Sequence, residues 1–248
     1  MSYVHATSVP VTEPVSLAQA RSFLRLPDSY VREDATITGF IAAAREQGEI
    51  LTGRSLAQRT WRMVLDSHPY YTDTIQSQLA YPPSYYSLPK YSTTLWNYSQ
   101  MIKLYYPPVI SVQQIRSIQP DGSVKTALQD VDFVLDRDSQ PARIFPLPSQ
   151  FWPADLYVPN SVVVDYTAGY DPDPTKIDTH NIASPPTSNP GQQPDSVMAV
   201  GIPQMIIVGI LNLVSYWYQN RGAVGQVPEN IERIFQQNMI VDFAPTRG

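Results

Sequence analysis

The stretch that decides the fold spans residues 16–61 and reads SLAQARSFLRLPDSYVREDATITGFIAAAREQGEILTGRSLAQRTW. Its first part predicts a short helix over 17–25, because Ser16 suits the N-cap position and Pro27 cannot continue a helix. A second helix is expected over about 32–52, where apolar residues recur at helical spacing. Two successive helices are therefore expected near the start of the chain.

The second helix carries one continuous apolar face. The residues that share this face are Ile37, Phe40, Ile41, Ala44, Gly48 and Leu51. Gly53 stands where many helices end in a left-handed residue. From Trp61 onward, apolar and polar side chains alternate, which is typical of a strand. The chain thus changes from helix to strand between these two residues.

Strand patterns fill the middle of the chain, and helices return near the C-terminus. Asp121-Gly122 favours a tight hairpin turn. Helices are expected over 203–220 and over 228–235. We expect the two helical ends to pack together, because each has an apolar stripe with no partner in its own segment. The expected strands lie at 101–106, 110–119, 124–128, 131–136, 143–146 and 161–168.

These elements predict an α+β fold. The N- and C-terminal segments form a helical bundle, with an inserted antiparallel β-rich domain, sandwich or barrel-like, and two long loops. The helical domain is expected at 1–57 and 203–235, and residues 1–15 are expected to form an extended arm. The β-rich domain is expected at 58–170 and includes a Tyr/Pro-rich loop at 67–101. A Pro-rich loop is expected at 171–202 and a C-terminal tail at 236–248.

The composition excludes several classes of protein. The chain has no cysteine, which excludes disulfides, thiolate nucleophiles and cysteine metal sites. We expect neither a secretion signal nor a membrane span. The net charge of −5 argues against a nucleic-acid-binding surface, although an acidic wall would suit a pore that DNA traverses without adhering. Charged residues make up only 16% of the chain, and so weakly charged a surface is typical of one that a partner covers.

No residue pattern indicates an enzyme, a cofactor or a metal. His5, His68 and His180 lie in the predicted arm or loops without metal-ligand spacing, so we interpret them as solvated. Asp136 and Asp138 could form a carboxylate pair or a cation site, but residues in a turn after a strand are usually solvated. A phosphate-binding glycine loop and a nucleophile elbow are both missing from the sequence.

The segment 67–101 is unusual because it holds seven tyrosines and only two charged residues. Tyrosine offers a large, rigid contact area with a polar tip and is enriched at interfaces. These side chains could meet a neighbouring protein, a carbohydrate or the chain's own β-rich domain. The candidate contact residues are Tyr70, Tyr71, Tyr81, Tyr85, Tyr86, Tyr91 and Tyr98.

Several segments resemble one family in their order and spacing, while 67–101 and 171–201 look like insertions. The family is that of the head–tail connector (adaptor) proteins of tailed bacteriophages and gene-transfer agents. The segments that carry the resemblance are 16–61, DYTAGY at 165–170, Ile202-Pro203, YWYQNR at 216–221 and VPE at 227–229.

The resemblance implies a structural role and no enzyme activity. Such adaptors form a ring, typically of twelve copies, that docks under the portal protein, extends the DNA channel and provides the platform for the next neck or tail protein. The expected location is the neck of the virion, at the head–tail interface, and the host cytoplasm during assembly. Because family members commonly grip the portal with a C-terminal segment, the candidate portal contacts are Ile240, Val241 and Phe243.

Two other assignments remain open from the sequence. One is a β-rich tail or baseplate binding module with an aromatic carbohydrate-binding surface. The other is a hydrolase. This assignment is the weakest, because the sequence shows no recognisable nucleophile–base pair or metal constellation. Helical arginines usually pair with a nearby glutamate, and Arg45 and Glu49 are four residues apart, so they can pair along the helix. Five arginines are also candidates for contact with DNA or with a portal carboxylate: Arg21, Arg25, Arg45, Arg54 and Arg59.

Overall fold

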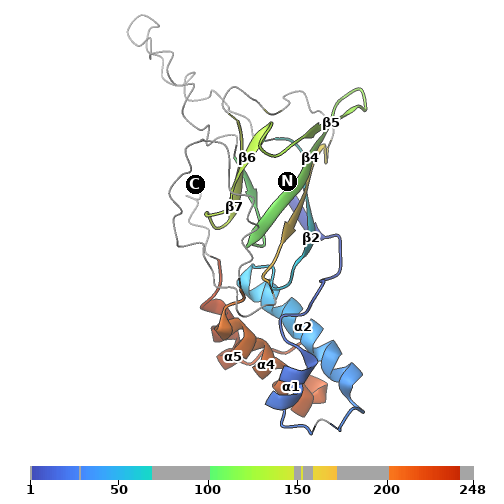
Figure 1. The fold of residues 1–248 in the computed structure, drawn as a ribbon, viewed down its shortest axis with the longest axis vertical. Helices are drawn as coiled ribbons and strands as arrows, with labels where there is room; N and C mark the ends of the chain where they lie inside the picture. Colours follow the sequence, from blue (N-terminus) through green and yellow to red (C-terminus); the bar gives the residue numbers. More distant parts are fainter. Residues whose placement is uncertain are drawn as a thin grey trace, which may run out of the picture.

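The computed structural model describes residues 2–27, 29–68, 101–147, 152, 159–171 and 201–240. The described part is elongated, with helices gathered at one end and antiparallel sheets at the other (Figure 1). The predicted α+β class is therefore confirmed. Each end has its own apolar cluster, and the two clusters share no residue.

Two helices near the N-terminus form as the sequence predicted. Helix α1 (Leu17–Phe23) begins with a capping box, in which Ser16 Oγ accepts from the Gln19 amide at 3.2 Å and Gln19 Oε1 accepts from the Ser16 amide at 2.9 Å. Helix α2 (Asp34–Thr52) ends at Gly53, whose φ of 67° lies in the left-handed region that glycine adopts without strain. The capping residues that the sequence indicated thus set the start of α1 and the end of α2.

The C-terminal segment returns to pack against these two helices. Helix α4 (Gln204–Gln219) contacts α1, α2 and α5 (Glu229–Gln236), and a short 3₁₀ helix, η4 (Arg221–Ala223), precedes α5. The largest buried side chains of this cluster include Ile37 of α2, Trp217 of α4 and Phe235 of α5. Residues far apart in the sequence therefore form one helical core, as the unpartnered apolar stripes predicted.

Phe235 is the centre of this helical core. Its ring is fully buried and lies against two glycines, Gly48 of α2 and Gly209 of α4. A Cβ atom at Gly48 would lie 3.0 Å from Phe235 Cε1, and one at Gly209 would lie 3.0 Å from Phe235 Cζ. Both distances are shorter than an ordinary carbon–carbon contact. The two helical glycines thus make the space that the ring fills.

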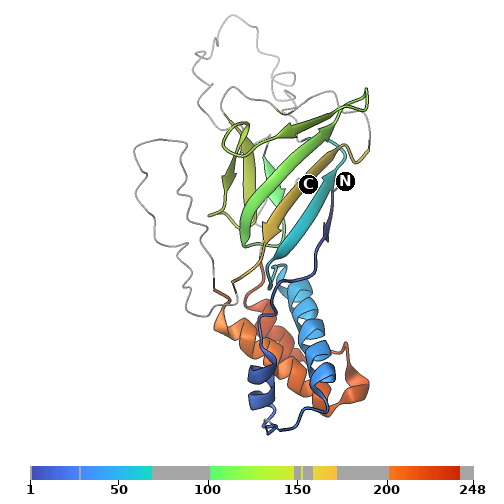
Figure 2. The same ribbon diagram turned by 45° about the vertical axis from the view of Figure 1, so that its right-hand side comes forward.

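The strands form two antiparallel sheets, which lie at the other end of the molecule (Figure 2). The five-stranded sheet has the order β1-β2-β8-β4-β5, and the three-stranded sheet has the order β3-β7-β6. Side chains from both sheets enter one apolar cluster. The strands are β1 (Ser2–Ala6), β2 (Arg59–Leu65), β3 (Ile102–Leu104), β4 (Val109–Ile118), β5 (Val124–Ala127), β6 (Phe133–Asp136), β7 (Ala142–Pro146) and β8 (Val162–Ala168).

One expectation about the N-terminus is wrong. Residues 2–6 are not a free extended arm but form the edge strand β1, which pairs with β2 from Ser2↔Leu65 to Ala6↔Trp61. The segment after β1 stays attached, because the Thr7 amide donates to Thr60 O and the Val11 amide donates to Gln58 O. Five residues show too little alternation to indicate a strand, and the pairing exists only because β2 offers an edge.

The sheet meets the helices at a close backbone contact. Gly169, which follows β8, has a φ of 132°, and a Cβ atom there would lie 2.3 Å from Ala57 O. Only glycine allows this approach between the end of β8 and the segment that joins α2 to β2. The same residue donates its amide to Pro108 O at 2.9 Å. The two ends of the molecule are therefore joined by tightly packed backbone.

Candidate functional site: the helix–sheet junction

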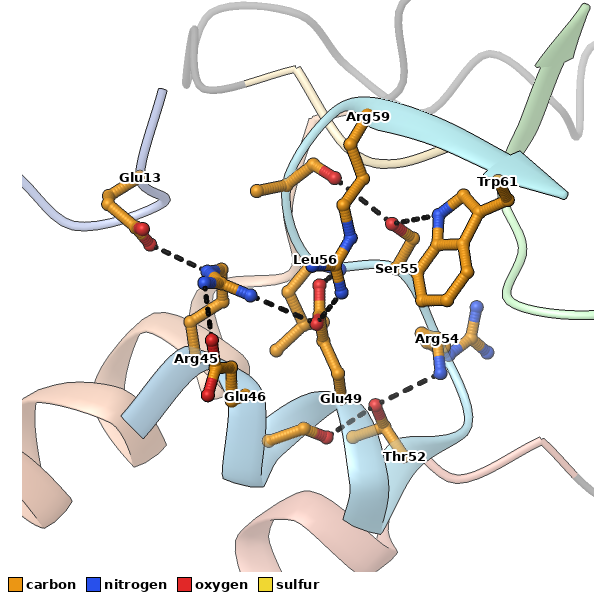
Figure 3. Close-up of polar contacts among 12 residues, drawn as sticks. Glu13, Arg45, Glu46, Glu49, Thr52, Arg54, Ser55, Leu56, Arg59 and Trp61 are labelled. Atoms are coloured by element: carbon orange, nitrogen blue, oxygen red, sulfur yellow. Dashed lines mark hydrogen bonds and ion pairs between the residues drawn. The ribbon is translucent and has the colours of Figure 1, made fainter. Parts of the chain in front are cut away.

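The main concentration of buried charge lies where α2 meets β2 (Figure 3). Glu49 and Arg45 of α2 are only 3% and 2% exposed. Arg45 Nη1 donates to Glu49 Oε2 at 3.0 Å, and Arg59 of β2 donates to the same oxygen. The Leu56 amide donates to Glu49 Oε1 at 2.9 Å. Glu49 thus connects the helix, the following turn and the strand.

The N-terminal segment also enters this group of charges. Glu13 Oε2 accepts from Arg45 Nε at 2.8 Å, and Glu46 Oε1 accepts from Arg45 Nη2 at 3.3 Å. We call Glu13, Arg45, Glu46, Glu49 and Arg59 the junction cluster. The four-residue spacing indicated the Arg45–Glu49 pair, which is confirmed. The contacts of Glu13 and Arg59 could not be read from the sequence, because they depend on how distant segments meet.

Burial dominates the electrostatics of the junction cluster. It raises the pKa of Glu49, and the guanidinium groups of Arg59 and Arg45 offset part of that increase. Burial opposes the charge of Arg45, but the carboxylates of Glu49 and Glu13 outweigh it and raise the pKa of Arg45. A buried charge without a partner costs several kcal/mol, so any shift of α2 against β2 that separated these groups would be costly. The cluster is suited to holding helices and sheet in one orientation.

The turn after α2 adds uncharged hydrogen bonds to the junction. Ser55 Oγ accepts from Trp61 Nε1 at 3.1 Å, which ties the turn to the sheet core. Arg54 Nη1 donates to Tyr170 OH at 3.0 Å, and Arg54 Nε donates to Asn238 O at 2.8 Å. One arginine therefore joins the turn, the segment after β8 and the segment after α5.

Most of the arginines that were candidates for contact with DNA or a portal carboxylate are held inside the subunit. Arg45 and Arg59 bind Glu49, and Arg54 donates to Asn238 O. Arg21 of α1 pairs with Asp34 at the start of α2, with Nε 2.8 Å from Oδ1. Arg25 differs, because its side chain is exposed. Four of the five candidates thus have structural roles, and the sequence indicated one of these contacts, the pairing of Arg45 with Glu49.

A second group of charges lies on the five-stranded sheet. Asp165 of β8 is 4% exposed and accepts from Arg62 Nε at 2.6 Å, from Gln114 Nε2 at 3.1 Å and from Arg116 Nη2 at 3.1 Å. Burial would raise the pKa of Asp165, but the hydrogen bonds of Arg62 and Gln114 and the charges of Arg62 and Arg116 lower it below the ordinary value. These side chains join β8 to β2 and β4 across the sheet.

The two aspartates of the turn between β6 and β7 form no carboxylate pair. Asp136 Oδ2 accepts from Arg143 Nε at 3.0 Å and from Ser139 Oγ at 2.7 Å, and its Oδ1 accepts from the Asp138 amide at 3.1 Å. The sequence suggested that Asp136 is a solvated turn residue. The structure shows instead that its side chain organises the turn. Across the described ranges, no three His, Cys, Asp or Glu residues gather in a way that could hold a metal ion.

The histidines also depart from the expectation. His5 belongs to β1, and His180 lies outside the described residues. His68 is 1% exposed rather than solvated, and its ring stacks on Trp152 with centroids 4.9 Å apart. His68 Nε2 lies 2.8 Å from Ser117 Oγ. Burial lowers the pKa of His68 from 6.5 to about 4. A single histidine after a strand gives no pattern from which this burial could be predicted.

We expect His68 to make the fold sensitive to acid. Its folded-state pKa lies below its unfolded-state value, so the unfolded chain binds the proton more tightly. Its contribution is present in full above pH 6.5 and is lost as the pH falls toward 4, by about 3 kcal/mol in total. Denaturant unfolding of the wild type and of His68→Gln should be measured from pH 7.5 to pH 4. A variant curve as steep as that of the wild type would contradict this assignment.

The residues that were expected to contact partners mostly lie outside the described residues. This holds for all seven candidate tyrosines, which fall within 69–100, and for Val241 and Phe243. Ile240 is described, and its amide donates to Thr52 O at 3.0 Å. No helix in the part of the chain that the structure describes could span a membrane, judged by its length and apolar character.

Comparison with known proteins gives a result only at the level of structure. No family model matches the sequence, and no curated protein matches it. A chain in the neck of an empty gene transfer agent (GTA) particle, computed with C6 symmetry, superimposes with a TM-score of 0.61 and 18% identity, over 99% of this chain and 100% of that one. This chain shares the fold of that neck chain.

Two further solved structures agree with this result. A chain from the virion of a native gene transfer agent particle has a TM-score of 0.61 and 16% identity, over 99% of both chains. A chain from the neck of a native GTA particle, computed with C12 symmetry, has a TM-score of 0.61 and 15% identity, over 99% of this chain and 100% of that one. The likeness thus extends over the whole chain and includes both the helical and the sheet ends.

Proposed function

We propose that this chain is a structural head–tail adaptor of a tailed phage or gene-transfer agent, without enzyme activity. The observation that carries the proposal is the fold shared over 99% of the chain with a GTA neck chain. The order and spacing of the sequence segments 16–61, 165–170, 202–203, 216–221 and 227–229 resemble the same family. A protein of this kind acts by assembly rather than by chemistry.

The proposed action is formation of a ring, with twelve copies as the expected number, beneath the portal protein. Subunits associate side by side through their helices, and the ring extends the DNA channel and offers a platform for the next neck or tail protein. The computation of two neck structures with C6 and C12 symmetry supports a ring. Many weak contacts in a ring add up to a strong joint. The net charge of −5 suits a channel that DNA passes without binding.

The parts of the subunit take the following roles in this proposal. The helices form a bundle, and the two sheets pack as a sandwich, which their shared apolar cluster supports. The junction cluster holds the two in the orientation that a closed ring requires. The Tyr/Pro-rich loop 67–101 and the Pro-rich loop 171–202 face a neighbouring subunit or the next tail protein. Virions carry the protein in their neck, and the host cytoplasm holds it during assembly.

The portal contact is assigned to the end of the chain. Because the Ile240 backbone is bonded to Thr52, we place the base of the tail there and its contact surface at Val241 and Phe243. This refines the boundary of the tail, since the chain up to Ile240 is attached to the helices.

Deleting residues 241–248 should leave a folded subunit, because the bonds of Asn238 and Ile240 to the rest of the fold are retained. The truncated protein should lose at least tenfold in affinity for purified portal rings, whereas it should keep the circular dichroism spectrum and the cooperative unfolding of the full chain. Affinity equal to that of the full chain would exclude the tail as the portal contact.

Electron microscopy of the neck tests the adaptor assignment itself. Negative-stain images should show rings of the protein on isolated portals, and immunogold labelling should place it at the neck of purified particles. Absence from the neck would refute the assignment. Monomers that bind glycans, with no rings on portals, would instead support a tail or baseplate module.

A further inference from the structure

An open apolar hollow lies beside the junction cluster. It has a volume of about 360 Å³ and is lined by Val4, Ile50, Gly53, Tyr105 and Tyr106. We call it the Ile50 pocket. The Ile50 side chain is 72% exposed and that of Tyr105 is 43% exposed, so two large apolar groups face solvent at one concave place. Such exposure is costly unless something covers it.

The floor of the Ile50 pocket is rigid. Tyr106 stacks face to face on Trp61, with centroids 4.1 Å apart and an interplanar angle of 9°. Tyr106 has a φ of 59°, a left-handed conformation that a bulky residue adopts only when its surroundings fix it. Val4 is held in register by the pairing of β1 with β2. A preformed pocket binds its occupant without paying to order these side chains.

The C-terminal tail begins next to this pocket. The Ile240 amide is bonded to Thr52 O, and Thr52 directly precedes Gly53 of the pocket wall. Arg54 Nε donates to Asn238 O and so holds the turn that comes just before Ile240. The next residues are Val241, Asp242 and Phe243. Three extended residues span about 10 Å, which is enough to pass around the end of α2 at Gly53.

We propose that in the free subunit the tail folds back and places Phe243 in the Ile50 pocket of its own chain. Phe243 offers an aromatic ring to Tyr105 and Tyr106 and apolar surface to Val4 and Ile50, the chemistry that the pocket presents. The effective concentration of a tail tethered this close is in the millimolar range, so even a weak contact is populated.

This docking regulates the portal contact, a consequence that rests on the proposed function. A tail that occupies its own pocket is not available to the portal, so the apparent affinity for the portal equals the intrinsic affinity multiplied by the fraction of subunits whose tail is free. The free subunit would therefore be kept from premature contacts, and the portal would release the tail by competition.

Disulfide trapping tests the docking directly, because the chain has no cysteine of its own. In the full chain, Ile50→Cys combined with Ala244→Cys should form an intramolecular disulfide under mild oxidation, since docking of Phe243, which this variant keeps, brings the two Cα atoms within about 7 Å. The matched control combines Thr36→Cys with Ala244→Cys. Thr36 is also exposed on α2, but it lies about 21 Å further along the helix.

Three results are distinguishable by non-reducing gel and peptide mass spectrometry. A disulfide within the monomer for the Ile50 pair, at least tenfold above the control pair, supports the proposal. Covalent dimers would overturn it and assign the pocket to the tail of a second copy. No disulfide, or equal yields for both pairs, would overturn it as well. The readout uses the isolated subunit, so it does not depend on whether the protein is an adaptor.

The same variant then tests the regulation on purified portal rings. The oxidised Ile50→Cys, Ala244→Cys protein, which keeps Val241 and Phe243, should bind at least tenfold more weakly than its reduced form. Equal binding of the two forms would refute competition between pocket and portal. If the wild type itself does not bind portal rings, the proposed function fails, while the disulfide result still decides where the tail docks.

Discussion

Replacing Phe235 by alanine should lower the free energy of unfolding by about 3–5 kcal/mol, the usual cost of deleting a fully buried aromatic ring. The cost should lie near the upper end of this range, because the cavity would be bounded by helix backbone at Gly48 and Gly209. Helix backbone cannot move inward to fill the space as flexible side chains do. Denaturant unfolding followed by circular dichroism measures the change.

Phe23→Ala is the matched control for this prediction. Phe23 is the same residue type, also lies on a helix of the helical end, and is 42% exposed. Its removal should cost about 1 kcal/mol or less. Equal losses for the two variants would show that Phe235 is not the centre of the core. Gly209→Ala should also destabilise the protein, although alanine normally favours a helix, because the new methyl group would press on the ring.

Replacing Glu49 by glutamine should also cost about 3–5 kcal/mol, because the buried guanidinium groups of Arg45 and Arg59 would lose their shared carboxylate. Glutamine keeps the shape of the side chain and can still accept from the Leu56 amide, so the change isolates the charge. Urea unfolding at pH 7 measures the effect. The matched control is Glu46→Gln, whose side chain is 65% exposed and whose loss should change stability by no more than about 0.5 kcal/mol.

A double-mutant cycle would show whether the charges themselves or only their pairing matter. Glu49→Leu combined with Arg59→Met removes one charge of each sign and leaves Arg45 paired with Glu13. Buried ion pairs replaced by apolar residues often lose little stability. The double variant should therefore be more stable than Glu49→Leu alone. A double variant that is less stable than either single variant would contradict the role given to this pair.

Local signals in the sequence predicted much of the secondary structure. Ser16 caps α1 and Gly53 ends α2 because capping depends on residues adjacent to the helix end. Asp121-Gly122 lies in the turn between β4 and β5, which pair from Ile118↔Val124 onward. Strand β1 escaped prediction because its stability comes from β2 and not from its own five residues.

Only one contact of the candidate site could be predicted from the sequence. The Arg45–Glu49 pair was visible because both residues lie on one helix face. The other partners of these charges, the burial of His68 and the Ile50 pocket were not visible, since each depends on segments that are remote in the sequence.

The sequence by itself determined the class of fold, the places where most helices and strands begin and end, and the family that the chain resembles, because these depend on local periodicity, capping residues and the order of short motifs. The tertiary structure alone decided which charges are buried together at the junction, why Phe235 needs Gly48 and Gly209, and where the tail leaves the helices. Such contacts depend on the distance between folded elements, and residue spacing along an unfolded chain carries no record of that distance.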